Sequence, residues 1–186
     1  RNSSDANRPR IDGLDGMKWV LAAILFSVSP AFGQTENVTI PSVTANPDVL
    51  YGCLASGKAA AQCLDAMTQD CRAENALGNE NLKERLCVVK ELNIWRGLHA
   101  QEHAALADRL NNLTDEQRST YFAAPAPFAA VAQSTWDEWQ GRQCKMERAV
   151  MGNHSRRAII EDTCTRDLVA LQFGRLRNIN RQLGIK

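Results

Sequence analysis

The sequence predicts an all-α protein, a small disulfide-stapled bundle of three longer and two to three short helices. Three observations support this fold class: no stretch alternates polar and apolar residues over five positions, apolar residues recur at helical spacing, and there are six cysteines. The 186 residues are 44% hydrophobic and 23% charged, which allows one globular domain with a sizeable core. This composition excludes a collagen, a low-complexity chain and a polytopic membrane protein.

The N-terminal part of the sequence resembles targeting sequence rather than folded protein. A basic Met17-Lys18 precedes an uncharged apolar stretch, 19–29, and then a small-x-small cleavage pattern at Ala31 and Gly33. This apolar stretch is shorter than the roughly 20 residues that span a membrane; the alternative is an uncleaved anchor. We therefore divide the chain into an upstream or vector-derived segment (1–16), a signal peptide (17–33), a flexible leader (34–46) and a helical domain (47–186).

The predicted export determines how we interpret the cysteines. All six follow the cleavage pattern, and an even number of cysteines in an exported chain indicates three disulfides. Zinc binding by the cysteines is the alternative, which their wide spacings disfavour. We expect a periplasmic or secreted protein with no membrane span after cleavage, and with no cofactor.

The helical domain begins with short helices. Pro47 suits a first helical position, and Ser56-Gly57 ends that helix. The Ala-rich segment 59–74 predicts a second helix, and Leu77-Gly78-Asn79 a turn. A long helix follows over 81–111.

The second half of the domain begins at a capping box, Thr114 to Gln117, which opens a short helix that Pro125-Ala-Pro127 breaks. Helices are predicted over 128–151 and 156–183, joined by the loop 152–155. The expected inward residues of the first are Phe128, Val131, Ala132, Thr135, Trp136 and Trp139. Those of the last helix are Ile160, Cys164, Leu168, Leu171, Leu176 and Ile179.

Helix geometry narrows the disulfide pairings. Cys63 and Cys71 lie eight residues apart, about 12 Å on one continuous helix, which is too far for a disulfide. Cys144 and Cys164 flank a helical hairpin, so we expect them to bond. For the remaining four we prefer Cys53–Cys63 and Cys71–Cys87, with Cys53–Cys87 as an alternative.

One segment has the spelling of an inverted zinc-peptidase motif. His99-Ala-Gln-Glu102-His103 reads H-x-x-E-H on a predicted helix, where two histidines at i and i+4 could bind zinc and Glu102 could act as a base. Glu138 or Glu161 would have to supply a third ligand. Exposed helix residues with a chance match are the simpler interpretation, so we assign no catalytic residue and no metal.

Two charged residues fall near predicted inner faces. Glu91 lies midway between Cys87 and Trp95, and Arg142 lies two residues before Cys144. Because an unpaired buried charge is costly, we predict that they form a partly buried pair. Simple exposure of each side chain is the alternative.

The net charge of +1 hides a division along the chain. Residues 34–141 hold 8 basic and 14 acidic residues, whereas residues 142–186 hold 10 basic and 4 acidic residues. The basic excess is either a solvated face or a surface for an acidic partner, an anionic envelope polymer or a membrane. We expect no nucleic-acid partner, because few exposed aromatic residues accompany the arginines. The arginines of the last predicted helix are Arg156, Arg157, Arg166, Arg175, Arg177 and Arg181.

Residues 132–144 read A-Q-S-T-W-D-E-W-Q-G-R-Q-C and include Gln133, Trp136, Arg142 and Cys144. They resemble the A-Q-x-x-W-x-x-aromatic-x-x-R-x-x-C stretch of the DUF1311 family, whose members are called lysozyme inhibitor LprI-like, although here one residue instead of two separates Arg142 from Cys144. Upstream, Cys87, Glu91, Trp95 and Leu98 match its C-x3-E-x3-W pattern. The chain departs from that pattern at Arg96, His99 and Glu102, where the family has Asp, Asn and Tyr.

The resemblance implies a small helical, disulfide-bonded protein of the bacterial envelope. Our leading expectation is an exported, non-enzymatic binding protein similar to LprI-type inhibitors, whose partner is lysozyme or another envelope protein. Many lysozymes are basic, so the acidic segment 34–141 could face one. The alternative is an envelope structural or stress protein that binds an anionic partner through its basic last helix, and the remote alternative is the zinc hydrolase.

Overall fold

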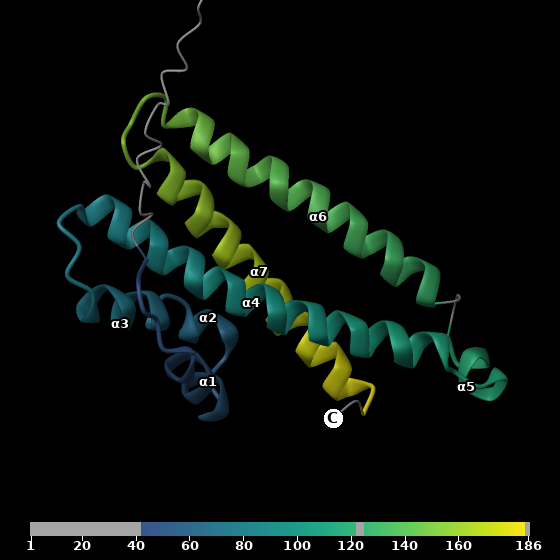
Figure 1. The fold of residues 1–186 in the computed structure, drawn as a ribbon. Helices are drawn as coiled ribbons and strands as arrows, with labels where there is room; N and C mark the ends of the chain where they lie inside the picture. Colours follow the sequence, from purple (N-terminus) through teal and green to yellow (C-terminus); the bar gives the residue numbers. More distant parts are fainter. Residues whose placement is uncertain (1–41, 122–124, 185–186) are drawn as a thin grey trace, which may run out of the picture. The chain divides into compact units, whose positions relative to one another are not determined.

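The structure, a computed structural model, describes residues 42–121 and 125–184 and confirms the all-α class, with no strand in these ranges (Figure 1). The predicted upstream segment 1–16, the signal peptide 17–33 and residues 34–41 lie outside them. None of the described helices is long and apolar enough to cross a membrane. The helices are α1 (Pro47–Ala55), α2 (Ala60–Cys63), α3 (Ala66–Glu74), α4 (Glu80–Asn111), α5 (Asp115–Ser119), α6 (Pro125–Val150) and α7 (Arg157–Gln182).

The long helices α4 and α7 run side by side in the same direction (Figure 1). Near their starts the guanidinium of Arg85 lies 2.7 Å from the carboxylate of Asp162. Near their ends Asn180 donates a hydrogen bond to the carbonyl of Glu102. The third long helix, α6, runs antiparallel to α7, as expected for a hairpin.

The main core lies where α1, α2 and α3 cover the α4–α7 pair. Trp95 of α4 is fully buried, and its ring packs at 5.5 Å between centroids on Phe173 of α7. A second cluster lies near the ends of α4 and α7. The main cluster also contains Leu50, Leu54, Cys63, Met67, Leu92, Val169 and Ala170.

All three preferred disulfides are confirmed, and every cysteine is paired. The bonds are Cys53–Cys63, Cys71–Cys87 and Cys144–Cys164, with Cα atoms 5.8, 5.7 and 5.5 Å apart. The alternative Cys53–Cys87 bond is excluded. Disulfides of this kind indicate an oxidising, extracellular environment.

The predicted helix over 59–74 is wrong, because the chain breaks it into α2 and α3. Leu64 is extended, with ψ of 141°, and Asp65 is left-handed, with φ of 68°. Asp is one of the few non-glycine residues that adopt this conformation readily. The break raises the number of short helices above the predicted two to three.

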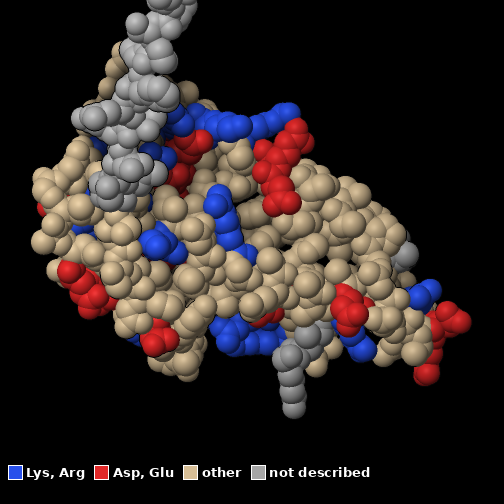
Figure 2. Space-filling view, in the orientation of Figure 1, with Lys and Arg blue, Asp and Glu red and all other residues tan. Residues whose placement is uncertain are grey.

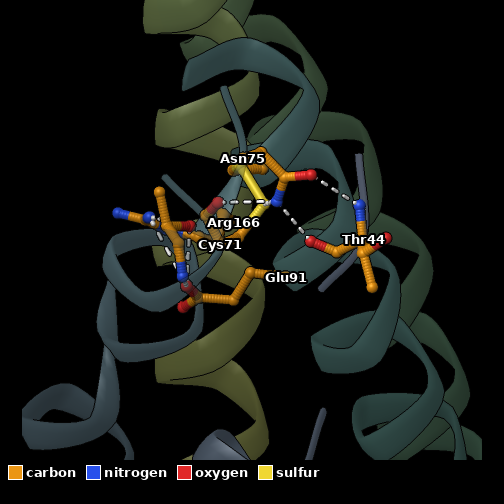
Figure 3. Close-up of a disulfide and its surroundings, with 7 residues drawn as sticks. Thr44, Cys71, Asn75, Glu91 and Arg166 are labelled. Carbon is orange, nitrogen blue, oxygen red and sulfur yellow. Dashed lines mark hydrogen bonds and ion pairs between the residues drawn. A yellow bond between two sulfur atoms is a disulfide. The ribbon is translucent and has the colours of Figure 1, made fainter. Parts of the chain in front are cut away.

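The predicted flexible leader is wrong for its last residues, 42–46, which pack against the core. Val43 is buried beside the Cys71–Cys87 disulfide. The Thr44 N–H donates to the side chain of Asn75, and the Asn75 amide donates to the carbonyls of Thr44 and Cys71 (Figure 3). These bonds tie the segment to the end of α3.

The start and the face of α6 also differ from prediction. Helix α6 begins at Pro125 rather than at the predicted residue 128, so Pro125 and Pro127 lie in its first turn, where N–H groups have no partner within a helix. Most of its predicted inward residues are exposed, including Phe128, Val131 and Trp139. Trp136 alone of the three aromatic residues packs against the core.

The inward face of α7 is rotated slightly from the predicted one. Cys164 and Leu176 are buried as expected, but Leu171 and Ile179 are 44% and 42% exposed. The residues that fill the interface instead are Ile159, Arg166, Val169, Ala170, Phe173 and Asn180. Two of these are polar, which is why an apolar-spacing argument misplaced the face.

Candidate functional site

The break before α3 is stabilised by a carboxylate from another helix. Glu91 of α4 is fully buried and accepts hydrogen bonds from the backbone N–H groups of Asp65 and Thr68, at 2.9 and 2.8 Å. It also accepts from the Thr68 hydroxyl and the Trp95 indole, at 2.7 and 3.0 Å. Glu91 therefore takes the place of an N-terminal capping residue for α3, whose own Asp65 side chain forms no cap.

The predicted Glu91–Arg142 pair is wrong, because the cation that faces Glu91 is Arg166 of α7 (Figure 3). The Arg166 guanidinium lies 3.8 Å from Glu91 and 2.8 Å from Asp65. Burial alone would lower the pKa of Arg166, but Asp167, Asp65 and Glu91 hold that pKa above its ordinary value. Arg142 instead pairs with Glu138 on the exposed surface of α6.

The residues that carry the family resemblance lie largely in the supporting structure. Glu91 and Trp95 are fully buried, and Trp136 packs against the core. Gln133 is half-buried and donates to Asp137 one turn later. Most of these positions therefore support the packing of the helices, whereas Arg142 is exposed on α6.

The H-x-x-E-H residues are divided between two helix interfaces. The His99 ring packs on Trp136 of α6, with centroids 5.1 Å apart. The Glu102 carboxylate instead accepts a hydrogen bond from Asn180 of α7, at 2.6 Å. His103 lines a hollow of about 330 Å³ between α4 and the start of α6. Within the described residues no three potential ligands gather as a metal site would require.

His99 is a buried polar side chain with an uncompensated nitrogen. The ring is 9% exposed, and Nε2 has no hydrogen-bond partner among the described residues. Burial lowers the pKa of His99 from 6.5; the negative charge of Asp137 opposes this shift and His103 adds to it. His99 is therefore a packing residue whose protonation would be costly.

Two arginines, Arg156 just before α7 and Arg166 in its first half, are neutralised by carboxylates, whereas Arg157 donates to the Gly152 carbonyl and the Asn153 side chain. Arg156 forms a two-pronged pair with Glu84, at 2.9 and 2.7 Å, which raises the pKa of Arg156. Arg166 is engaged by the buried network described above. These cations organise the fold and are not available to a ligand.

The second half of α7 is different. Arg175, Arg177 and Arg181 line one hollow of about 410 Å³ together with Lys58 from the turn between α1 and α2. In the part of the chain that the structure describes, none of the four forms an ion pair with a carboxylate. We call this hollow and its four cations the cationic groove.

Close packing between α2 and α7 forms the groove. A Cβ built on Gly174 would lie 3.3 Å from the Cβ of Ala60, so glycine allows the α1–α2 segment to approach α7 closely. The guanidinium of Arg177 lies over the Phe173 ring, 5.7 Å from its centroid. Figure 2 shows basic side chains gathered between the α1–α2 segment and the end of α7.

Sequence reasoning found three of these cations but missed the fourth. The arginines stand out as a basic series on the last predicted helix. Lys58 lies 117 residues before Arg175, and only the fold brings it there. No local pattern around Lys58 marks it.

Comparisons of the chain with protein-family models, with curated proteins and with solved structures find no significant match.

Proposed function

We propose that this chain is an exported, non-enzymatic binding protein, periplasmic or secreted, that holds an anionic partner in the cationic groove. The observation that carries the proposal is the set of four cations around one hollow, none of which is ion-paired within residues 42–121 and 125–184. Like charges gathered without counter-charges repel one another, and a bound anion would relieve that repulsion. This is the function expected of an envelope protein that uses its basic last helix.

Rigidity of the groove supports a binding role. The Cys53–Cys63 bond joins the two helices that flank Lys58, and Ala60 packs on Gly174. A groove that is held in place before binding loses little conformational entropy when a ligand arrives. The described residues offer the groove no nucleophile-and-base pair, so we assign it binding rather than catalysis.

The experiment is a titration of the oxidised protein with fluorescent polyglutamate at low and at moderate salt. We expect saturable binding that weakens with salt, because exposed charges are screened. The variant K58Q/R175Q/R181Q should bind at least about tenfold more weakly.

The matched control is K90Q/R96Q/K145Q, which removes the same charge from exposed positions outside the groove. It should bind like the wild type. Equal loss of affinity in both variants would mean that net charge, rather than the groove, attracts the polymer.

Lysozyme inhibition is a second proposal, which rests on the LprI-like resemblance and on the acidic excess of residues 34–141. Exposed carboxylates at the start of α5, on Asp115 and Glu116, are among the described acidic side chains that a basic enzyme could contact. The test measures lysozyme turnover in the presence of the oxidised protein. No inhibition at high micromolar concentration would reject this proposal and leave the groove proposal intact.

A further inference from the structure

We propose that the ligand of the cationic groove is a protein segment that carries an apolar side chain beside a run of carboxylates. This inference rests on the proposed function and makes it specific. Its basis is a second hollow that adjoins the groove and differs from it in chemistry.

The second hollow, about 260 Å³, is lined largely by apolar side chains of α1, α4 and α7, so we call it the apolar hollow. Tyr51, Leu54, Leu98 and Phe173 contribute to its wall. Leu54, Phe173 and Arg177 line both hollows, which are therefore adjacent. Arg177 stands at the junction, held over the Phe173 ring.

The charged side chains of the two hollows determine which part of a ligand binds in each. The cationic groove has four cations and no lining carboxylate, whereas Glu102 lines the apolar hollow. The Glu102 carboxylate would repel a ligand carboxylate at that end. A ligand therefore places its acidic groups beside Lys58, Arg175 and Arg181, and an uncharged apolar group beside Tyr51.

Exposed apolar side chains at both hollows favour a peptide over a purely anionic polymer. Tyr51 of the apolar hollow and Leu171 of the cationic groove are each 44% exposed. A polysaccharide or polyphosphate would leave these groups in water, whereas a peptide with a Leu or Phe side chain would bury them. A flat bilayer surface fits a concave groove poorly.

The test compares two short fluorescent peptides of equal charge against the oxidised full chain. One carries consecutive glutamates followed by Leu-Phe, and the other has Ser-Ser in place of Leu-Phe. Burial of one large apolar side chain corresponds to roughly tenfold or more in affinity. We expect the Leu-Phe peptide to bind at least tenfold more tightly than the Ser-Ser peptide.

Two variants test whether Tyr51 contacts the apolar side chains of the Leu-Phe peptide. Tyr51→Ser should weaken binding of the Leu-Phe peptide severalfold and leave the Ser-Ser peptide unchanged. Val131→Ser, which removes an exposed apolar side chain from α6, should change neither. Both positions are exposed, so both variants should fold.

The outcomes separate this inference from the function on which it rests. Equal binding of the two peptides, lost in K58Q/R175Q/R181Q, would overturn the inference and keep the anionic groove. Tighter binding to anionic phosphatidylglycerol vesicles than to the Leu-Phe peptide would also overturn it. Binding of no anionic probe would reject the inference and the proposed function together.

Discussion

Glu91 caps a helix to which it does not belong. Its carboxylate accepts the N–H groups at the start of α3 and faces the buried Arg166 of α7. The single side chain thereby connects α4 to α3 through charge-assisted hydrogen bonds and to α7 through an ion pair at 3.8 Å.

Glu91→Gln should lower the free energy of unfolding by about 3–5 kcal/mol, because a buried amide puts N–H donors against the donors that the carboxylate accepts and withdraws one of the three carboxylates around Arg166, leaving Asp65 and Asp167. Urea unfolding measures the loss. The exposed Arg142→Gln should cost less than about 0.5 kcal/mol. In a double-mutant cycle Glu91→Gln and Arg166→Gln should be non-additive; strict additivity would contradict the network.

Protonation of His99 should destabilise the protein. Burial lowers the pKa of His99 from 6.5 in the folded state, so below pH 6.5 the unfolded chain binds more protons than the folded chain. Stability should therefore fall as the pH drops below about 6.5. We expect His99→Gln to reduce this slope in urea unfolding across that range, and the exposed loop variant His154→Gln to retain it. Identical slopes in all three proteins would contradict the assignment.

Among single residues, the sequence predicted the cysteine partners but not the partner of Glu91. Spacing along neighbouring helices favoured the three observed bonds but left Cys53–Cys87 open, and the continuous helix used to exclude Cys63–Cys71 is broken at Asp65. The Glu91 contacts depend on the left-handed break at Asp65 and on the rotation of α7, and neither leaves a pattern in the apolar spacing.

At the scale of elements, α6 carries two candidate faces, and the larger apolar residues occupy the outer one. Phe128, Val131 and Trp139 are 66%, 63% and 50% exposed. The face toward α4 and α7 uses small and polar side chains together with Trp136, including Ala126, Ala129, Gln140 and Cys144. The prediction assumed that the large apolar side chains face the core, and it therefore assigned the wrong face of α6 to the interior.

Substitutions on the two faces of α6 should differ in cost. Val131→Ser should change the free energy of unfolding by no more than about 0.5 kcal/mol, since the side chain is exposed. Trp136→Ala should cost clearly more, because it removes the contact with His99. Thermal unfolding of both variants measures the two costs. A larger cost for Val131→Ser than for Trp136→Ala would mean that α6 turns its other face to the core.

The Cys144–Cys164 bond fixes α6 to α7 and closes a loop of 20 residues. Replacing both cysteines with alanine should cost roughly 2–4 kcal/mol in denaturant unfolding. Amide exchange should rise more in α6 than in α4, because α6 depends on this link and α4 lies in the core. Unchanged stability after its removal would contradict a structural role for the bond.

At the scale of the whole molecule, the fold separates the basic residues of 142–186 into two groups that the sequence does not distinguish. Arg156 and Arg166 are neutralised near the first half of α7, whereas the cations of its second half meet Lys58 in one groove. The basic excess of residues 142–186 was visible in the sequence. Which of these basic residues form ion pairs, and which line the groove without a carboxylate partner among the described residues, depends on tertiary contacts with α1, α2 and α4.

The most direct test of the cationic groove observes its arginines during binding. Side-chain Nε–H resonances of the oxidised protein are followed by NMR as polyglutamate is added. Signals of Arg175, Arg177 and Arg181 should shift saturably, while those of Arg156 and Arg166, already bound to carboxylates, should stay in place. Shifts of equal size at Arg96 and Arg118, or no shift at the three groove arginines, would contradict the account.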